Sequence, residues 1–308
     1  MTTFKKLLLA AACLLLPAWL SAADAPLRVV TLHPILTEFA TAIGGDAARV
    51  EGLVPGGVDP HTYEPAPKQV AAARAADLVL ATGLRLEGFL DKIAAGEGRP
   101  DRVVRVGERL PFLIVGACEH DHGADAEAHD HTHGELDPHW WHSVHNALFV
   151  TDVIRAELTR LRPAEAGAFS LRAQQLQQRL FALQAWAAEK IKALPAERRH
   201  LFTTHDAFGY LARDFGFTMH PLAGLSTESE PNAKRVAELV EEVRRLGVKA
   251  VFAEDSASSR LIQTLATEAG VKVPPSLYAD GPGAPGSGVE TYEAMYRVNL
   301  GTIIGALR

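Results

Sequence analysis

The sequence predicts an α/β fold of two lobes, each with a small parallel sheet flanked by helices, joined by one long helix. Two observations support this prediction. Short runs of β-branched and apolar residues alternate with segments of helical periodicity, both before residue 164 and after residue 194, which is typical of parallel sheets covered by helices. Residues 164–194 are rich in helix formers and contain no proline, so we expect one uninterrupted connecting helix there.

The composition is that of a folded protein large enough for two domains. The chain has 308 residues, of which 47% are hydrophobic and 22% are charged. Its net charge of -6 provides no basic surface for nucleic acid, so no nucleic-acid partner is expected. The apolar heptads of residues 164–194 are not sustained long enough to favour a coiled-coil dimer, and we expect a monomer.

Residues 1–23 have the features of a secretory signal peptide. Two lysines precede an apolar run that is short for a membrane span, and small residues follow it. We therefore expect cleavage after Ala23 and export to the periplasm, although Cys13 leaves processing as a lipoprotein open. Cleavage would leave Cys118 as the remaining cysteine, which rules out an intramolecular disulfide.

The first lobe is expected to span residues 24–163. A strand that begins at Leu27 leads into a helix that ends at the glycine pair Gly44 and Gly45. The later elements alternate in the same way, with strands over 48–54, 77–83 and 102–108 and helices over 68–76 and 86–96.

The second lobe is expected over residues 195–308 and repeats this pattern. A strand that begins at His200 is followed by a helix that ends at Gly216. Further helices and strands alternate after it, with helices over 231–247, 258–270 and 291–307 and strands over 249–255 and 271–280.

Histidine is concentrated in one part of the chain. Residues 118–146 contain eight of the thirteen histidines, and the first part of this stretch, the His-rich loop 118–134, has no apolar periodicity. Its histidines alternate with acidic residues, glycine and alanine: His120, His122, His129, His131 and His133. Such a composition is typical of weak metal binding, so these five are auxiliary ligand candidates; a solvated polar insertion is the alternative.

Four other residues have the chemistry and the position of metal ligands. They are His61, His139, His205 and Asp280, and each follows a predicted strand or lies in a large connecting loop. Parallel sheets bind ligands at the carboxyl ends of their strands, and each lobe contributes two of the four, so we expect the metal site between the lobes. Three imidazoles and one carboxylate suit tetrahedral zinc. Taken alone, a histidine at such a position is more often a hydrogen-bonded loop residue.

The chain contains five segments that together resemble motifs of one family: DPHTYEP, LDPHWW, TTHDAFGYLARDFGF, AED and YADG. The family is that of the zinc-binding solute-binding proteins of bacterial ABC importers, the ZnuA-like and AztC-like members of cluster A-I. The resemblance implies two lobes joined by one rigid helix, with a metal ion between them and no enzymatic activity. His61, His139 and His205 match the histidines of the family motifs, and Asp280 matches the late acidic position that is the fourth ligand in some members.

The function that the resemblance implies is capture of Zn2+ in the periplasm and delivery to the membrane permease of an ABC importer. A periplasmic zinc chaperone is a further candidate partner. Manganese-binding relatives carry Glu where this chain has His205, so the third imidazole favours zinc over manganese or another divalent metal, although copper competes by the Irving–Williams order. A secreted zinc hydrolase is the alternative from another class, but the chain has no HExxH motif and Asp280 would close the coordination.

The chain departs from the family pattern after the second motif. Relatives usually continue as WLDPxN, whereas residues 141–146 read WHSVHN. The change puts in doubt the contacts that orient His139. His142 and His145 are either auxiliary ligands or ordinary polar residues beside the site, and Glu64 suits a supporting role.

Overall fold

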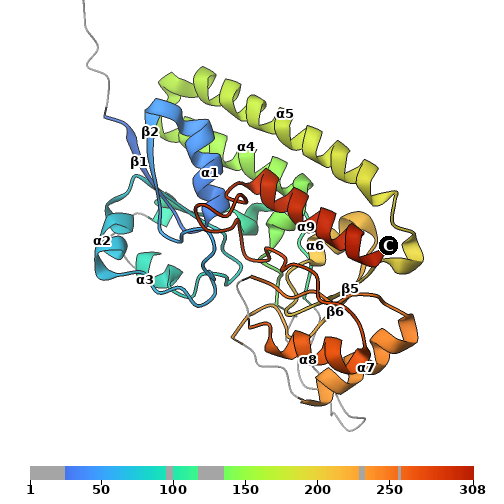
Figure 1. The fold of residues 1–308 in the computed structure, drawn as a ribbon. Helices are drawn as coiled ribbons and strands as arrows, with labels where there is room; N and C mark the ends of the chain where they lie inside the picture. The colour runs from blue at the N-terminus through green and yellow to red at the C-terminus, as the bar shows by residue number, and fades with distance from the viewer. Residues whose placement is uncertain (1–24, 95–99, 117–134, 229–232, 256–257) are drawn as a thin grey trace, which may run out of the picture.

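The structure is a computed structural model that describes residues 25–94, 100–116, 135–228, 233–255 and 258–308. Its architecture confirms the predicted α/β fold class. Each half of the chain forms a parallel sheet with helices packed on it, and α5 (Ala166–Ile191) extends along the molecule from the first half to the second (Figure 1). The expected signal peptide and the His-rich loop 118–134 lie outside the described residues.

The first sheet has four parallel strands in the order β2-β1-β3-β4. They are β1 (Leu27–Thr31), β2 (Ala48–Gly52), β3 (Leu78–Ala81) and β4 (Val103–Arg105). Every residue of β3 is buried, as a strand with helices on both faces of its sheet requires. The helices of this half are α1 (Pro34–Gly44), α2 (Pro67–Ala75), α3 (Leu90–Ala94) and α4 (Val144–Leu161).

The second sheet is built on two paired parallel strands, β5 (His200–Thr203) and β6 (Thr218–Pro221). Residues 250–254 and 272–277 continue it through single parallel bridges instead of the full strands that the sequence predicts. The second of these segments contains Pro274 and Pro275, which have no N–H to donate to a neighbouring strand. The helices here are α6 (Gly209–Phe215), α7 (Ala233–Leu246) and α8 (Arg260–Ala269).

A group of packed helices joins the two halves. The helix α5 contacts α1, α4 and α9 (Tyr292–Leu307), and its 26 residues give a length of roughly 39 Å. Its buried side chains recur at helical spacing, as predicted: Phe169, Leu176, Leu180, Leu183 and Ile191. One apolar cluster runs from Leu27 to Leu307 through these helices, so the two halves share a core. The lobe boundaries given above therefore stay a prediction.

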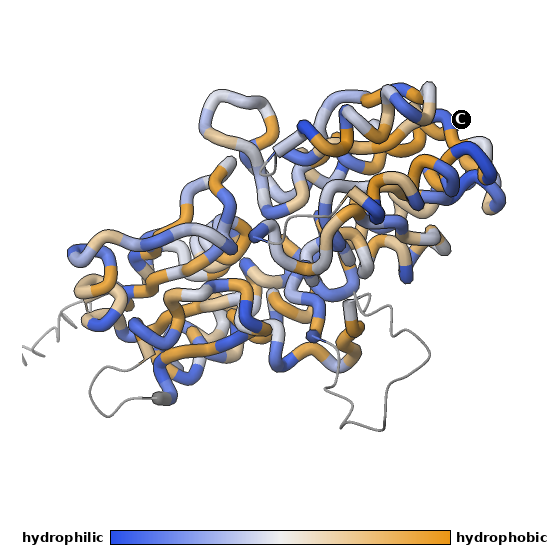
Figure 2. The backbone as a smooth tube through the Cα atoms, turned by 90° about the horizontal axis from the view of Figure 1, so that it is seen from below, coloured by the Kyte–Doolittle hydropathy of each residue, from blue (hydrophilic) through white to orange (hydrophobic). Residues whose placement is uncertain are grey.

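Apolar and polar residues alternate along the helices in Figure 2, as amphipathic elements around a buried core require. Within the described part of the chain, no helix combines the length and the apolar character needed to cross a membrane.

Candidate metal centre

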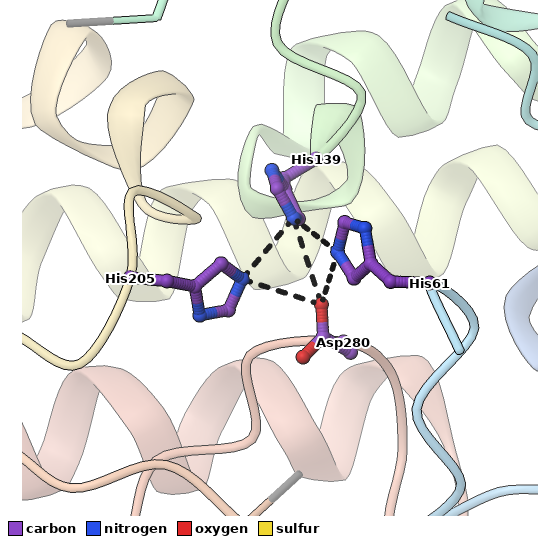
Figure 3. Close-up of side chains that lie close together, drawn as sticks. All are labelled: His61, His139, His205 and Asp280. Carbon is purple, nitrogen blue, oxygen red and sulfur yellow. Dashed lines mark hydrogen bonds and ion pairs between the residues drawn. The ribbon is translucent and has the colours of Figure 1, made fainter. Parts of the chain in front are cut away.

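The structure brings together the four residues that the sequence singles out as metal ligands (Figure 3). His61 lies in the turn-rich loop after β2, and His139 lies directly before a short 3-10 helix, Trp140–His142. His205 follows β5, and Asp280 follows the bridged segment 272–277. All four therefore converge from loops, three of them directly downstream of sheet segments, as the rule for ligand sites in parallel sheets predicts.

The four candidate ligand atoms lie within 4.8 Å of one another. The Nε2 atom of His139 lies 3.2 Å from Nε2 of His61 and 3.4 Å from Nε2 of His205. Oδ1 of Asp280 lies 3.3 Å from Nε2 of His61 and 3.5 Å from that of His139 and of His205. Zinc bonds of about 2.0 to 2.1 Å to nitrogen and oxygen require tetrahedral edges of about 3.3 to 3.4 Å. Five of the six separations among the four atoms are therefore close to those of a tetrahedral zinc site.

The site is withdrawn from solvent. The side chains of His139, His205 and Asp280 are no more than 2% exposed, and that of His61 is 5% exposed. Burial acts to raise the pKa of Asp280, but the three histidines around it outweigh burial and hold this pKa well below its usual range. The site therefore offers an ionised carboxylate among three imidazoles, which partly offsets the charge of a cation.

Two carboxylates orient two of the imidazoles from behind. Asp137 Oδ1 lies 2.8 Å from Nδ1 of His139 and also accepts the backbone N–H of His139 at 2.8 Å. Glu254 bonds to Nδ1 of His205, and its other oxygen accepts the backbone N–H groups of Thr204 and His205 at 2.9 and 3.1 Å. A carboxylate at Nδ1 fixes the tautomer in which Nδ1 carries the proton and leaves the Nε2 lone pair for the metal.

The same carboxylates change the affinity of the histidines for protons. Burial acts to lower the pKa of His139, but its bonds to Asp137 and Asp280 raise it overall. Burial also opposes a charge on His205, yet Glu254 and Asp280 raise its pKa well above the ordinary value. A metal ion therefore has to displace protons from both rings, because coordination needs the neutral imidazole.

Three side chains from the first half of the chain hold the backbone that carries Asp280. The indole N–H of Trp141 donates to the carbonyl of Ala279 at 2.8 Å, and Nε2 of His142 lies 2.8 Å from the same oxygen. Nε2 of His33 lies 3.1 Å from the carbonyl of Asp280. These bonds fix the aspartate against the histidines of the first half.

This arrangement answers the question that the WHSVHN departure raises. His142 is not one of the four clustered ligands: its Nε2 is bonded to Ala279, and its ring packs against Phe208 with 4.3 Å between centroids. Burial lowers the pKa of His142 to about 3, so the ring is neutral. His145 lies on α4 and bonds to Gln184 at 2.9 Å.

The other residues that the sequence raised lie elsewhere. Glu64 is exposed, pairs with Lys92 at 2.9 Å and is not among the clustered ligand candidates. Two further histidines, His200 and His220, bond to each other at 3.0 Å on β5 and β6. Sequence reasoning missed Asp137 and Glu254 as the partners of the ligands, although both stand within motifs, two residues before His139 and inside the AED segment. The five loop histidines lie outside the described residues.

Comparisons with known proteins agree with this fold and site. A family model described as ZnuA, zinc-uptake complex component A periplasmic, matches residues 29–306. The manganese-binding lipoprotein MntA of Bacillus subtilis is 33% identical over 292 residues, which cover 93% of this chain and 91% of the relative. The zinc-binding protein TroA of Treponema pallidum is 32% identical over 292 residues, which also cover 93% of this chain and 91% of the relative.

The fold is also that of a solved relative. The structure of the periplasmic zinc binding protein TroA from Treponema pallidum superposes with a TM-score of 0.80 at 31% identity, covering 92% of this chain and 99% of that one. The α/β fold with a buried site of three histidines and one aspartate for a divalent metal ion is thereby confirmed, as is a role in binding and not in catalysis. The chain belongs to the ZnuA family of cluster A-I, the metal-binding solute-binding proteins whose partner is the membrane permease of an ABC transporter.

Proposed function

We propose that this protein captures Zn2+ in the periplasm and delivers it to the permease of an ABC importer, with His61, His139, His205 and Asp280 as the four zinc ligands. The observation that carries the proposal is the cluster of three imidazole nitrogens and one carboxylate oxygen, in which five of the six separations are 3.2 to 3.5 Å, close to those of a tetrahedral zinc site.

The donor set favours zinc over manganese. The two relatives above carry different metals in their names, manganese for MntA and zinc for TroA, at nearly equal identity. Manganese suits carboxylate, carbonyl and water oxygens in six-coordinate sites, whereas zinc accepts imidazoles in a four-coordinate one. A cluster of three imidazole nitrogens and one carboxylate oxygen therefore supports zinc. Copper also binds imidazole strongly, so a test has to include it.

The test is the metal content of the purified mature protein, followed by competitive titration with zinc, manganese and copper. We expect one tightly held zinc, and a loss of affinity in His61→Ala, His139→Ala, His205→Ala and Asp280→Ala. Each loss should exceed the roughly 10- to 100-fold that removal of an outer partner causes. His145→Ala is the matched control, because this histidine bonds to Gln184 outside the cluster and should leave affinity unchanged. Manganese bound as tightly as zinc would contradict the proposal.

We also propose that the five histidines of the His-rich loop bind zinc weakly as auxiliary ligands. The support is their composition alone: they alternate with acids and small residues. Deletion of residues 119–134 should remove weak sites and slow uptake at scarce zinc while the tight site persists. If tight binding survives all four ligand substitutions and disappears with this deletion, the protein is a histidine-rich metal buffer instead.

A further inference from the structure

A cavity of about 160 Å³ adjoins the outer side of His61, between the two halves of the chain. Its walls come from the loop after β3, which includes Leu86 and Gly88, and from the segment that begins at Glu135. The second half of the chain closes it with a segment that ends at Glu228. Of the four proposed ligands, His61 is the one found among the described residues that line this space.

The cavity is lined by strongly exposed residues as well as by the buried side chain of His61. At its inner end, Leu86 is 1% exposed and the side chain of His61 is 5% exposed. At its outer end, the side chains of Arg85 and Glu135 are 83% and 59% exposed. One water occupies on the order of 30 Å³ in the liquid, so the space holds several waters and accommodates a partly hydrated cation.

The outer end carries charges that act on a cation. The two acidic residues Glu135 and Glu228 both belong to the lining. Glu135 pairs with Arg85 at 2.9 Å, which reduces the local negative potential but keeps that carboxylate at the mouth. Carboxylates beside a low-dielectric passage raise the local concentration of cations and their rate of association.

The other three proposed ligands are not among the described residues that line this cavity, and their side chains are at most 2% exposed. An ion that arrives from the cavity meets His61 before the rest.

We infer that this cavity is the route by which the metal ion reaches and leaves the site, with His61 the first ligand to bind it and Glu135 and Glu228 attracting it at the mouth. The inference rests on the proposed function, because it assigns the path to the site proposed there for zinc.

Gly88 allows a direct test. It lines the cavity, and a Cβ atom built on it meets no atom within 4 Å, so a side chain can be introduced at this position. We therefore compare Gly88→Phe with Gly88→Ala, which adds a single methyl and leaves the path open. Gly167→Phe on α5 is the matched control, since an added Cβ there also meets no atom within 4 Å and this glycine does not line the cavity.

The measurement is zinc association by stopped-flow tryptophan fluorescence, with dissociation into a chromogenic chelator and affinity by competitive titration. Trp141 is a suitable reporter because its ring centroid lies 5.3 Å from that of His139. We expect Gly88→Phe to slow association and dissociation by the same factor, about tenfold or more, with Kd unchanged, because an obstacle on a path changes neither end state. Gly88→Ala and Gly167→Phe should keep wild-type rates.

Three results would overturn the inference. Rates in Gly88→Phe equal to those of Gly167→Phe mean that the ion uses another path. A weaker Kd caused by faster dissociation alone means that the cavity supports the site and is not a path. The double variant Glu135→Gln/Glu228→Gln should bind zinc more slowly, and its association rate should depend less on ionic strength. If both quantities stay at their wild-type values, the carboxylates of Glu135 and Glu228 do not attract the ion. Absence of a tight zinc in the wild type would instead refute the proposed function.

Discussion

Replacing Glu254 by glutamine keeps the shape of a buried side chain and removes the charge behind one ligand. The carboxylate now accepts hydrogen bonds from Nδ1 of His205 and from the backbone N–H groups of Thr204 and His205. A glutamine has one accepting oxygen and one donating nitrogen on these two sides. With its oxygen on the backbone donors, its NH2 group faces Nδ1, which favours the tautomer that carries the proton on Nε2, where the metal has to bind.

The expected loss of zinc affinity follows from the role of a carboxylate that orients a metal-binding histidine. Loss of an outer partner to a metal-binding histidine lowers affinity by about 10- to 100-fold, which is about 1.4 to 2.7 kcal/mol. The pH dependence gives a second signature. Glu254 is the main cause of the raised pKa of His205, and burial alone would lower this pKa. In the variant, zinc competes less with a proton on His205, although Asp280 still raises the pKa of this histidine. The logarithm of the zinc association constant should therefore rise less steeply with pH, by up to one unit per pH unit.

The proton on His205 affects both the stability of the metal-free protein and the zinc affinity. A raised pKa means that protonated His205 stabilises the metal-free fold below pH about 6.5, and that this contribution is lost as pH rises through the raised pKa. Zinc and this proton compete for His205, so the zinc affinity of the unmodified protein falls as pH falls. The affinity deficit of Glu254→Gln should therefore be largest in alkaline solution and should narrow toward acid.

The assay is competitive zinc titration at several pH values between about 6 and 9. Glu242→Gln is the matched control, because Glu242 lies 3.2 Å from Nδ1 of His220 in a pair outside the metal cluster. Its affinity curve should coincide with that of the unmodified protein. Equal affinity of Glu254→Gln and the unmodified protein, or a deficit that is the same at every pH, would refute the reasoning.

Three further predictions concern other parts of the same arrangement. His142→Phe should weaken zinc binding, because it removes one hydrogen-bond donor to the carbonyl of Ala279. If His142 acts through Asp280, a double-mutant cycle should show that the same substitution causes no further loss in an Asp280→Asn background. His205→Glu should not confer manganese binding, since the new carboxylate faces Glu254, whereas the double variant with Glu254→Gln should bind manganese more tightly in titration. Leu183→Ala in α5 should lower the free energy of unfolding in denaturant by about 2 to 5 kcal/mol with zinc affinity unchanged.

The fold and the four ligand positions could be predicted because both follow from local patterns. Alternating strands and helices fix a parallel sheet, and the carboxyl ends of its strands fix where polar side chains gather. The helix predicted over 164–194 is observed over 166–191, and that predicted over 291–307 is observed over 292–307. The helix α4 is missing from the prediction although Ala147, Val150, Ile154 and Leu158 stand at helical spacing in the sequence.

The partners of the ligands could not be predicted, because they depend on which segments become neighbours. Glu254 and His205 are 49 residues apart and meet because residues 250–254 lie beside β5 in the second sheet. Likewise, the bond from His142 to Ala279 spans 137 residues. Sequence periodicity does not indicate such distant pairs. The sequence therefore showed that His142 departs from the family motif but not that it contacts Ala279.

Hydrogen bonds join the two halves of the chain near the metal site, through Ala279 and through Asp59. Trp141 and His142 hold Ala279, and the hydroxyl of Thr227 donates to Asp59, which also accepts the backbone N–H of His61 at 2.8 Å. None of these bonds uses a proposed ligand atom, so they persist when the site fills and keep the cluster preorganised. On the proposed route the ion passes beside His61 while these bonds stay intact, and a side chain at position 88 should therefore change the rates and not the affinity.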